Sequence, residues 1–335
     1  MIALYLLLSC FVYYAKSSTT VIRMPRGTYR IPVEFIAVEG DETLPGFATF
    51  QVKSVIYETA TRPLSFYFPP YYFPARGIRV GEGEERSSFY FDQPVMIRLN
   101  QDRSIVLPGG PQFPAAGSRS MECFRSSFLF SALSRAEDAL IINPTNPREY
   151  AYEGQIFYTP IDSDWQFSYL HSWPIRTTAR LTDASGTLPS LAGNGGSEFV
   201  RSALNFNLQE SEGYVPVPSQ LRVPLLARII SMGVQYNFGD ETSGNILLEE
   251  MEPDRLGAFP SFEIMIPTED GTQVHIALIP PSDYITPTET PGVYQIVFSL
   301  LVDRYVINHR ILQNLLIHFD YTNNRIGFGE PLVEL

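Results

Sequence analysis

Residues 315–328, near the C-terminus, read LLIHFDYTNNRIGF. The first six of them form an apolar and aromatic run that is typical of a β-strand. Similar runs of β-branched and aromatic residues recur along the chain and are separated by clusters of Gly, Pro and Asp. They occupy residues 47–56, 87–100, 127–133, 155–159, 165–170, 262–266, 273–278, 294–302 and 315–320. This pattern predicts a mainly β fold with many short strands.

Two stretches predict short helices within this β framework. Residues 218–235 carry apolar side chains at helical spacing, and Ser219 precedes them as a candidate N-cap. The apolar positions are Leu221, Leu225, Ile229 and Met232. Residues 306–316 are a second candidate for a helical turn. We therefore expect a few short helices among the strands.

The N-terminus has the pattern of a secretory signal. Residues 2–14 form one apolar run of about 13 residues, and Ala15-Lys16-Ser17 follow it. This run is short for a membrane span, which needs about 20 residues. We expect residues 1–17 to be a cleaved signal peptide, the protein to be secreted and no membrane span to remain; an uncleaved anchor is the alternative. Cleavage would remove Cys10 and leave Cys123 alone, so no internal disulfide is expected.

Composition excludes several functions. The 335 residues include 24 Lys+Arg and 36 Asp+Glu, and this net charge of −12 argues against binding of nucleic acid, which depends on basic side chains. The apolar fraction of 44% is enough for a large core. Four scattered His without a Cys pair do not predict zinc, and G-x-S-x-G, P-loop and H-E-x-x-H motifs are absent. We expect no metal and no cofactor.

Seven blocks of sequence, in order, resemble the pepsin-like aspartic proteases. The last is the stretch quoted first, whose FDYTNNRIGF is similar to the segment that closes those chains. The other six are residues 127–135 (SFLFSALSR), 139–144 (ALIINP), 152–161 (YEGQIFYTPI), 165–167 (WQF), 259–264 (FPSFEI) and 281–285 (PSDYI). Within these blocks, Tyr152 and Trp165 are expected to pack in the core or against a sheet. The resemblance covers about 200 residues.

The resemblance implies two β-lobes joined by a shared central sheet, with a peptide cleft between them. We expect residues 18–160 to form a shortened N-terminal lobe with strands of the central sheet, and residues 161–335 to form the C-terminal lobe. In that family each lobe supplies one Asp within Asp-Thr-Gly or Asp-Ser-Gly. The two carboxylates share one proton and activate a water molecule.

Neither catalytic triplet occurs in this sequence. In the N-terminal half, residues 62–74 resemble the strand and loop of the first triplet, but Pro69-Pro70-Tyr71 replace it. Tyr90 is a candidate for the flap tyrosine, and the isolated carboxylate of Asp92 fits a turn residue better than a catalytic acid.

The C-terminal loop has two possible positions. One is residues 182–188, where Ala184 takes the place of the Asp and Asp183 is displaced by one residue; the other is residues 209–212, where Glu210 is the candidate acid. The apolar-apolar-Gly segment that packs behind this loop would be residues 306–308, with Asn308 in place of Gly. No catalytic residue is assigned.

We therefore expect a secreted pepsin-like homologue that is catalytically inactive and binds a peptide or protein partner in the inter-lobe cleft. One alternative is a divergent aspartic endopeptidase that uses Asp183 or Glu210. The other is a structural surface protein without a ligand in the cleft.

Overall fold

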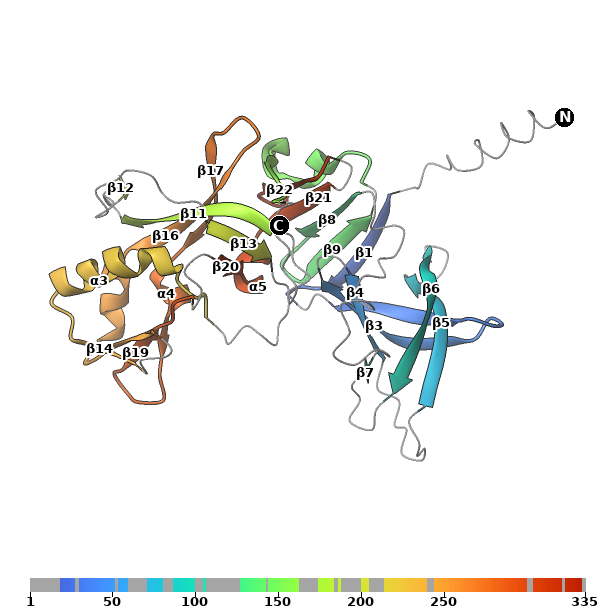
Figure 1. The fold of residues 1–335 in the computed structure, drawn as a ribbon, viewed down its shortest axis with the longest axis horizontal. Helices are drawn as coiled ribbons and strands as arrows, with labels where there is room; N and C mark the ends of the chain where they lie inside the picture. The colour runs from blue at the N-terminus through green and yellow to red at the C-terminus, as the bar shows by residue number, and fades with distance from the viewer. Residues whose placement is uncertain are drawn as a thin grey trace.

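Four β-sheets make up most of the residues that the computed structural model describes (Figure 1). These residues are 19–27, 30–51, 54–59, 71–80, 87–99, 105–106, 127–142, 144–162, 174–183, 186–187, 200–204, 214–239, 244–299, 304–320 and 323–332. Short helices connect some of the strands. The prediction of a mainly β chain is confirmed.

The central sheet combines strands from both ends of the chain. Its six strands, in spatial order, are β1 (Thr20–Pro25), β9 (Glu137–Ile142), β8 (Ser127–Ala132), β21 (Leu316–Asp320), β22 (Arg325–Gly329) and β10 (Phe157–Pro160). Every neighbouring pair is antiparallel. All five residues of β21 are buried, so both faces of this strand are covered. In Figure 1 the sheet lies between the remaining N-terminal and C-terminal strands.

The N-terminal sheet is a separate antiparallel layer. Its strands, in spatial order, are β4 (Ser54–Thr59), β3 (Thr43–Gln51), β2 (Arg30–Ala37), β5 (Tyr71–Val80), β6 (Ser87–Leu99) and β7 (Ile105–Val106). The expected single run at residues 47–56 is a hairpin, because Gln51 pairs with Ser54. Phe35 and Ile78 on this sheet belong to the same hydrophobic core as Phe130 of the central sheet.

The C-terminal part contains two sheets. The larger one has the order β17 (Gln273–Ile279), β16 (Ser261–Pro267), β11 (Pro174–Asp183), β13 (Val200–Leu204) and β20 (Arg304–Ile307), and β12 (Gly186–Thr187) pairs with the end of β11. The smaller one has the order β14 (Tyr236–Phe238), β15 (Ile246–Leu248), β19 (Tyr294–Ile296) and β18 (Ile285–Pro287). Among the named strands of the described chain, β13 and β20 are the one parallel pair.

Both predicted helical stretches contain a helix. Residues 218–235 include η6 (Ser219–Leu221) and α3 (Arg222–Ser231), and residues 306–316 include α5 (His309–Leu312). The N-cap prediction for Ser219 is wrong: a 3-10 turn precedes the α-helix, so its N-cap is Leu221. The other helical elements are η4 (Pro147–Tyr150), η5 (Tyr152–Gly154), η7 (Pro253–Ala258) and α4 (Pro281–Tyr284). None of the helices in the described ranges has the length and hydropathy of a membrane span.

Two glycines of β22 let Gln155 and Ile156, which come just before β10, pack closely against this strand. A Cβ on Gly327 would lie 2.5 Å from Cγ2 of Ile156, and one on Gly329 would lie 2.6 Å from the carbonyl oxygen of Gln155. Both distances are far shorter than a carbon atom tolerates, so a side chain at either position would push the segment away. The edge of the central sheet therefore depends on glycine at these positions.

Candidate functional site

The parallel strands β13 and β20 end side by side. Leu204 pairs with Ile307, so the chain leaves both strands at the same end of the sheet. The apolar residues at the end of β20, followed by Asn308, form the segment that the family resemblance places behind a catalytic loop. After Leu204 the sequence continues as Asn205-Phe206-Asn207, which lies outside the described residues.

Asn308 is buried at the end of β20 and holds a neighbouring segment. Its Nδ2 donates a hydrogen bond of 3.0 Å to the carbonyl oxygen of Tyr214, and its Oδ1 is buried without a partner in the described part of the chain. Next to it, burial lowers the pKa of His309. The described residues that end these two strands thus include an amide and an imidazole but no carboxylate.

The structure places Asp183 at a different end of the sheet. Asp183 is the last residue of β11 and pairs with Gly186, whereas Pro174, at the start of β11, pairs with Ala203. Nine residues separate Pro174 from Asp183, a distance of roughly 30 Å along a strand. Asp183 is therefore remote from the ends of β13 and β20.

Most of the other candidate residues lie where the structure does not describe a side chain. Glu210, Pro69, Trp165 and Cys123 lie outside the described residues, and Asp92 is placed only as a backbone position in β6. Tyr90 is exposed on β6, with the guanidinium of Arg76 5.8 Å from its ring centre.

The sequence analysis did not predict β13 as a strand. β13 ends at Leu204, 15 residues before the 3-10 turn that begins at Ser219. That strand contains Arg201 and Ser202, so its residues do not alternate cleanly between polar and apolar.

A hollow of about 420 Å³ lies between the C-terminal sheet, the central sheet and α5. Ligand pockets have volumes of about 300–1,000 Å³. The hollow is lined by residues 275–279 of β17, residues 328–330 at the end of β22, Phe157 of β10 and Gln155 just before that strand. The other lining residues are Arg310, Ile311, Asn314 and Leu315 in and after α5, together with Tyr152, Val215 and Asp283. None of the described residues of β2 to β7 lines it.

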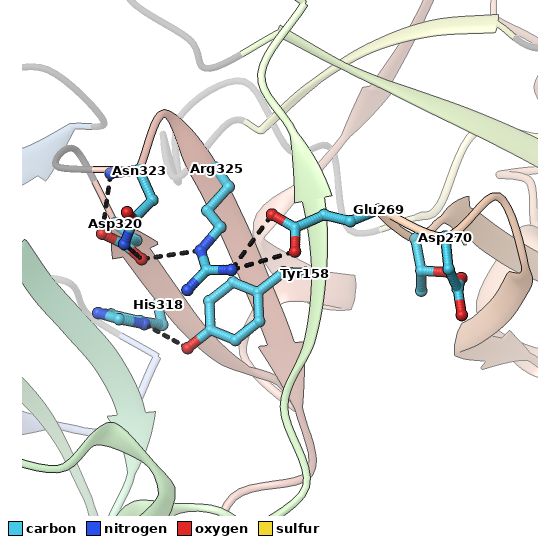
Figure 2. Close-up of polar contacts among 8 residues, drawn as sticks. Tyr158, Glu269, Asp270, His318, Asp320, Asn323 and Arg325 are labelled. Carbon is cyan, nitrogen blue, oxygen red and sulfur yellow. Dashed lines mark hydrogen bonds and ion pairs between the residues drawn. The ribbon is translucent and has the colours of Figure 1, made fainter.

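A cluster of charged side chains fastens the β16–β17 hairpin to the central sheet (Figure 2). The Nε of Arg325 donates to Oδ2 of Asp320 at 2.8 Å, and its Nη1 donates to both carboxylate oxygens of Glu269 at 3.1 and 3.2 Å. Glu269 lies in the turn between β16 and β17. The guanidinium also lies 4.0 Å from the ring centre of Tyr158. We call Arg325, Asp320 and Glu269 the hairpin clamp.

Hydrogen bonds hold Asp320 of the hairpin clamp and the hairpin turn next to Glu269 in place. Burial alone would raise the pKa of Asp320, but donors from Asn323 and Arg325 outweigh it and hold this pKa below its ordinary value. In the hairpin turn, the hydroxyl of Thr268 and the N–H of Thr272 lower the pKa of Asp270 to about 2. Both carboxylates stay ionised well into the acidic range.

Beside the clamp, a histidine is held neutral in the core. His318 is 4% exposed, and its Nδ1 lies 2.8 Å from the hydroxyl of Tyr158. Burial lowers the pKa of His318 to about 4, although Asp320 acts in the opposite direction. Burial likewise raises the pKa of Tyr158. This pair packs the centre of the sheet and does not reach the hollow, which Phe157 lines from the same strand.

The described residues form a hollow and a structural clamp. In the described part of the chain, no three His, Cys, Asp or Glu side chains gather as a metal site requires. Tyr152, expected to pack in the core or against a sheet, is 51% exposed and lines the hollow. In comparisons with known proteins, no family model and no curated protein sequence matches this chain.

Proposed function

We propose that this chain is a secreted, bilobal pepsin-like homologue that does not hydrolyse peptides and instead binds a peptide or protein partner between its lobes. The central sheet carries the proposal. Four of the seven blocks that resemble the family, residues 127–135, 139–144, 152–161 and 315–328, contribute the strands β8, β9, β10, β21 and β22 of this one sheet. Segments that are far apart in sequence and resemble one family thus meet in space.

The absence of catalysis is supported by residue types. Two carboxylates are needed to share a proton and activate water. The sequence has neither Asp-Thr-Gly nor Asp-Ser-Gly, and Asn308 takes the place of the glycine behind the C-terminal loop. The residues that follow β13 in the sequence are Asn205-Phe206-Asn207, which include no carboxylate.

Cleavage of a broad peptide library, from about pH 4 to pH 7 with and without a statin-type inhibitor, tests the proposal. Wild type is compared with Asp183→Asn and Glu210→Gln. We expect no inhibitor-sensitive turnover by any of the three proteins, together with peptides that the protein retains in equilibrium dialysis. Turnover that the inhibitor and one of the two substitutions both abolish would establish the active endopeptidase instead.

The same experiment also tests the alternative of a structural surface protein without a ligand in the cleft. A protein that neither cleaves nor retains any peptide has no ligand of this kind, and the proposal of a binding function would then be wrong. A matched pepsin-like enzyme in parallel shows that the library contains cleavable sequences.

A further inference from the structure

β17 is an edge strand with one side unoccupied by the described chain. It pairs with β16 along residues 273–279 and ends the order of its sheet. In antiparallel pairing, alternate residues direct both the N–H and the C=O away from the partner strand. Among the described residues, no backbone hydrogen bond joins β17 to any strand other than β16. These outward groups can pair with an added strand.

The hollow runs along this edge. Residues 275–279 all line it, although successive side chains of a strand point to opposite faces. A hollow that five consecutive residues touch therefore follows the side of the strand. Across from β17 stand residues 328–330 and Phe157 of the central sheet.

The walls expose large apolar side chains. Tyr152 is 51%, Phe157 38% and Leu278 53% exposed, and all three line the hollow. Side chains of this size normally bury more of their surface, and such exposure around a concavity indicates a place for apolar groups of a ligand.

The charges favour a basic ligand. Two carboxylates, Asp283 and Glu330, line the hollow against one guanidinium, that of Arg310. The chain as a whole carries a net charge of −12. Long-range attraction and the local balance therefore both favour Lys or Arg in whatever approaches this surface.

We infer that the hollow between β17 and the central sheet binds an extended segment of a partner protein, with apolar residues alternating with Lys or Arg, which adds as a strand to the free edge of β17. Backbone hydrogen bonds along an edge supply affinity, and side-chain pockets supply selectivity. The hairpin clamp fixes β17 before the ligand arrives, which reduces the ordering cost of binding. This site does not depend on the proposed inter-lobe function, because no described residue of the N-terminal sheet contributes to it.

The probe is a fluorescein-labelled octapeptide of alternating valine and lysine, measured by fluorescence anisotropy on the full chain. One control has alternating L- and D-residues, which keep the composition but disrupt a regular strand. A second control replaces lysine by glutamate. We expect both controls to bind at least about tenfold more weakly. Hydrogen exchange of residues 273–279 should slow when the valine–lysine peptide is bound.

Two substitutions locate the site on the protein. Leu278→Lys places a like charge in the hollow and should weaken binding about tenfold or more, whereas Val223→Lys on α3, which is 70% exposed and outside the hollow, should not change it. Glu330→Gln should weaken binding of the lysine peptide without affecting the fold.

Three results would overturn the inference: no binding at millimolar peptide, equal binding of the L/D control, or slowed exchange elsewhere but not in β17. Sedimentation of the protein alone tests whether a second copy of this chain occupies the free edge of β17. A dimer that Leu278→Lys dissociates would assign the edge to self-association and exclude the partner peptide.

Discussion

The buried imidazole of His318 gives the sharpest test of the structure. His318→Gln keeps an oxygen that can accept from the hydroxyl of Tyr158 but cannot take up a proton. Among the described residues, the titratable or charged groups around the imidazole include Tyr158 on β10, Asp320 on its own strand and Arg325 on β22. All three are present in the variant, so a change in pH dependence comes from the imidazole and from its effect on the pKa of Asp320.

The magnitude follows from the two states of the chain. In the folded protein the pKa of His318 is about 4, whereas an exposed histidine has a pKa of about 6.5. Below pH 6.5 the unfolded chain binds a proton that the folded protein refuses, so stability is complete above about pH 6.5 and falls until about pH 4. At 1.36 kcal/mol per pH unit the loss is about 3 kcal/mol.

Urea unfolding of wild type, His318→Gln and a control, His275→Gln, from about pH 7.5 to about pH 4 measures this effect. His275 is exposed on β17, so its replacement removes no buried imidazole. We expect the stability of His318→Gln relative to wild type to rise by about 3 kcal/mol between the two ends of the range. The control should parallel wild type throughout.

Two results would refute this reasoning. One is an acid-induced loss of stability in His318→Gln as large as that of wild type. The other is an NMR titration in which the His318 ring protonates near pH 6.5, as an exposed ring does.

Three further predictions concern the same region. Arg325→Gln leaves the largely buried Asp320 without its guanidinium and should lower the free energy of unfolding by about 2 kcal/mol, while Glu269→Gln, at the exposed end of the clamp, should lower it by less than about 1 kcal/mol in the same urea assay. Gly329→Ala should cost about 1–3 kcal/mol because of the carbonyl of Gln155, whereas Gly257→Ala, with open space around it, should change stability by less than about 0.5 kcal/mol. Asp138→Asn keeps an acceptor for the N–H of Gly27 but removes a carboxyl whose pKa burial raises. Wild type loses stability as pH rises above the ordinary pKa of Asp, about 3.9, whereas the variant does not. The melting temperature of the variant relative to that of wild type should therefore rise with pH above about 4, and a constant difference would contradict this.

Strands with regular alternation could be predicted from the sequence. The runs that became β6, β8, β16, β17 and β21 consist of β-branched and aromatic residues, and each lies within one or two residues of its expected limits. β13 was missed because its sequence, VRSAL, has no clear period. The hydroxyl of Ser202 in this strand is satisfied by Thr177 of β11 at 2.6 Å, a partner that no local pattern reveals.

The hairpin clamp and the hollow could not be predicted from the sequence, because both combine residues that are far apart along the chain. The sequence analysis selected Asp183 and Glu210, because a single acidic residue near a family motif can be found without knowledge of the fold. The hairpin clamp joins Glu269 to Arg325 across 56 residues, and the hollow combines segments from residue 152 to residue 330. Only the link from Asp320 to Arg325 is local, within the stretch FDYTNNR that also carried the family resemblance.

The buried histidine also determines where the cleavage experiment is informative. At about pH 4 the cost of keeping His318 neutral is greatest, although the low pKa values of Asp320 and Asp270 keep the clamp and the hairpin turn charged. Lack of turnover at that pH would therefore not distinguish an inactive site from a destabilised fold. Above about pH 6.5 the imidazole is neutral in both the folded and the unfolded chain and contributes no such cost. Retained peptide without cleavage near neutral pH, with the urea midpoint measured in the same buffer, therefore separates an inactive site from a destabilised fold.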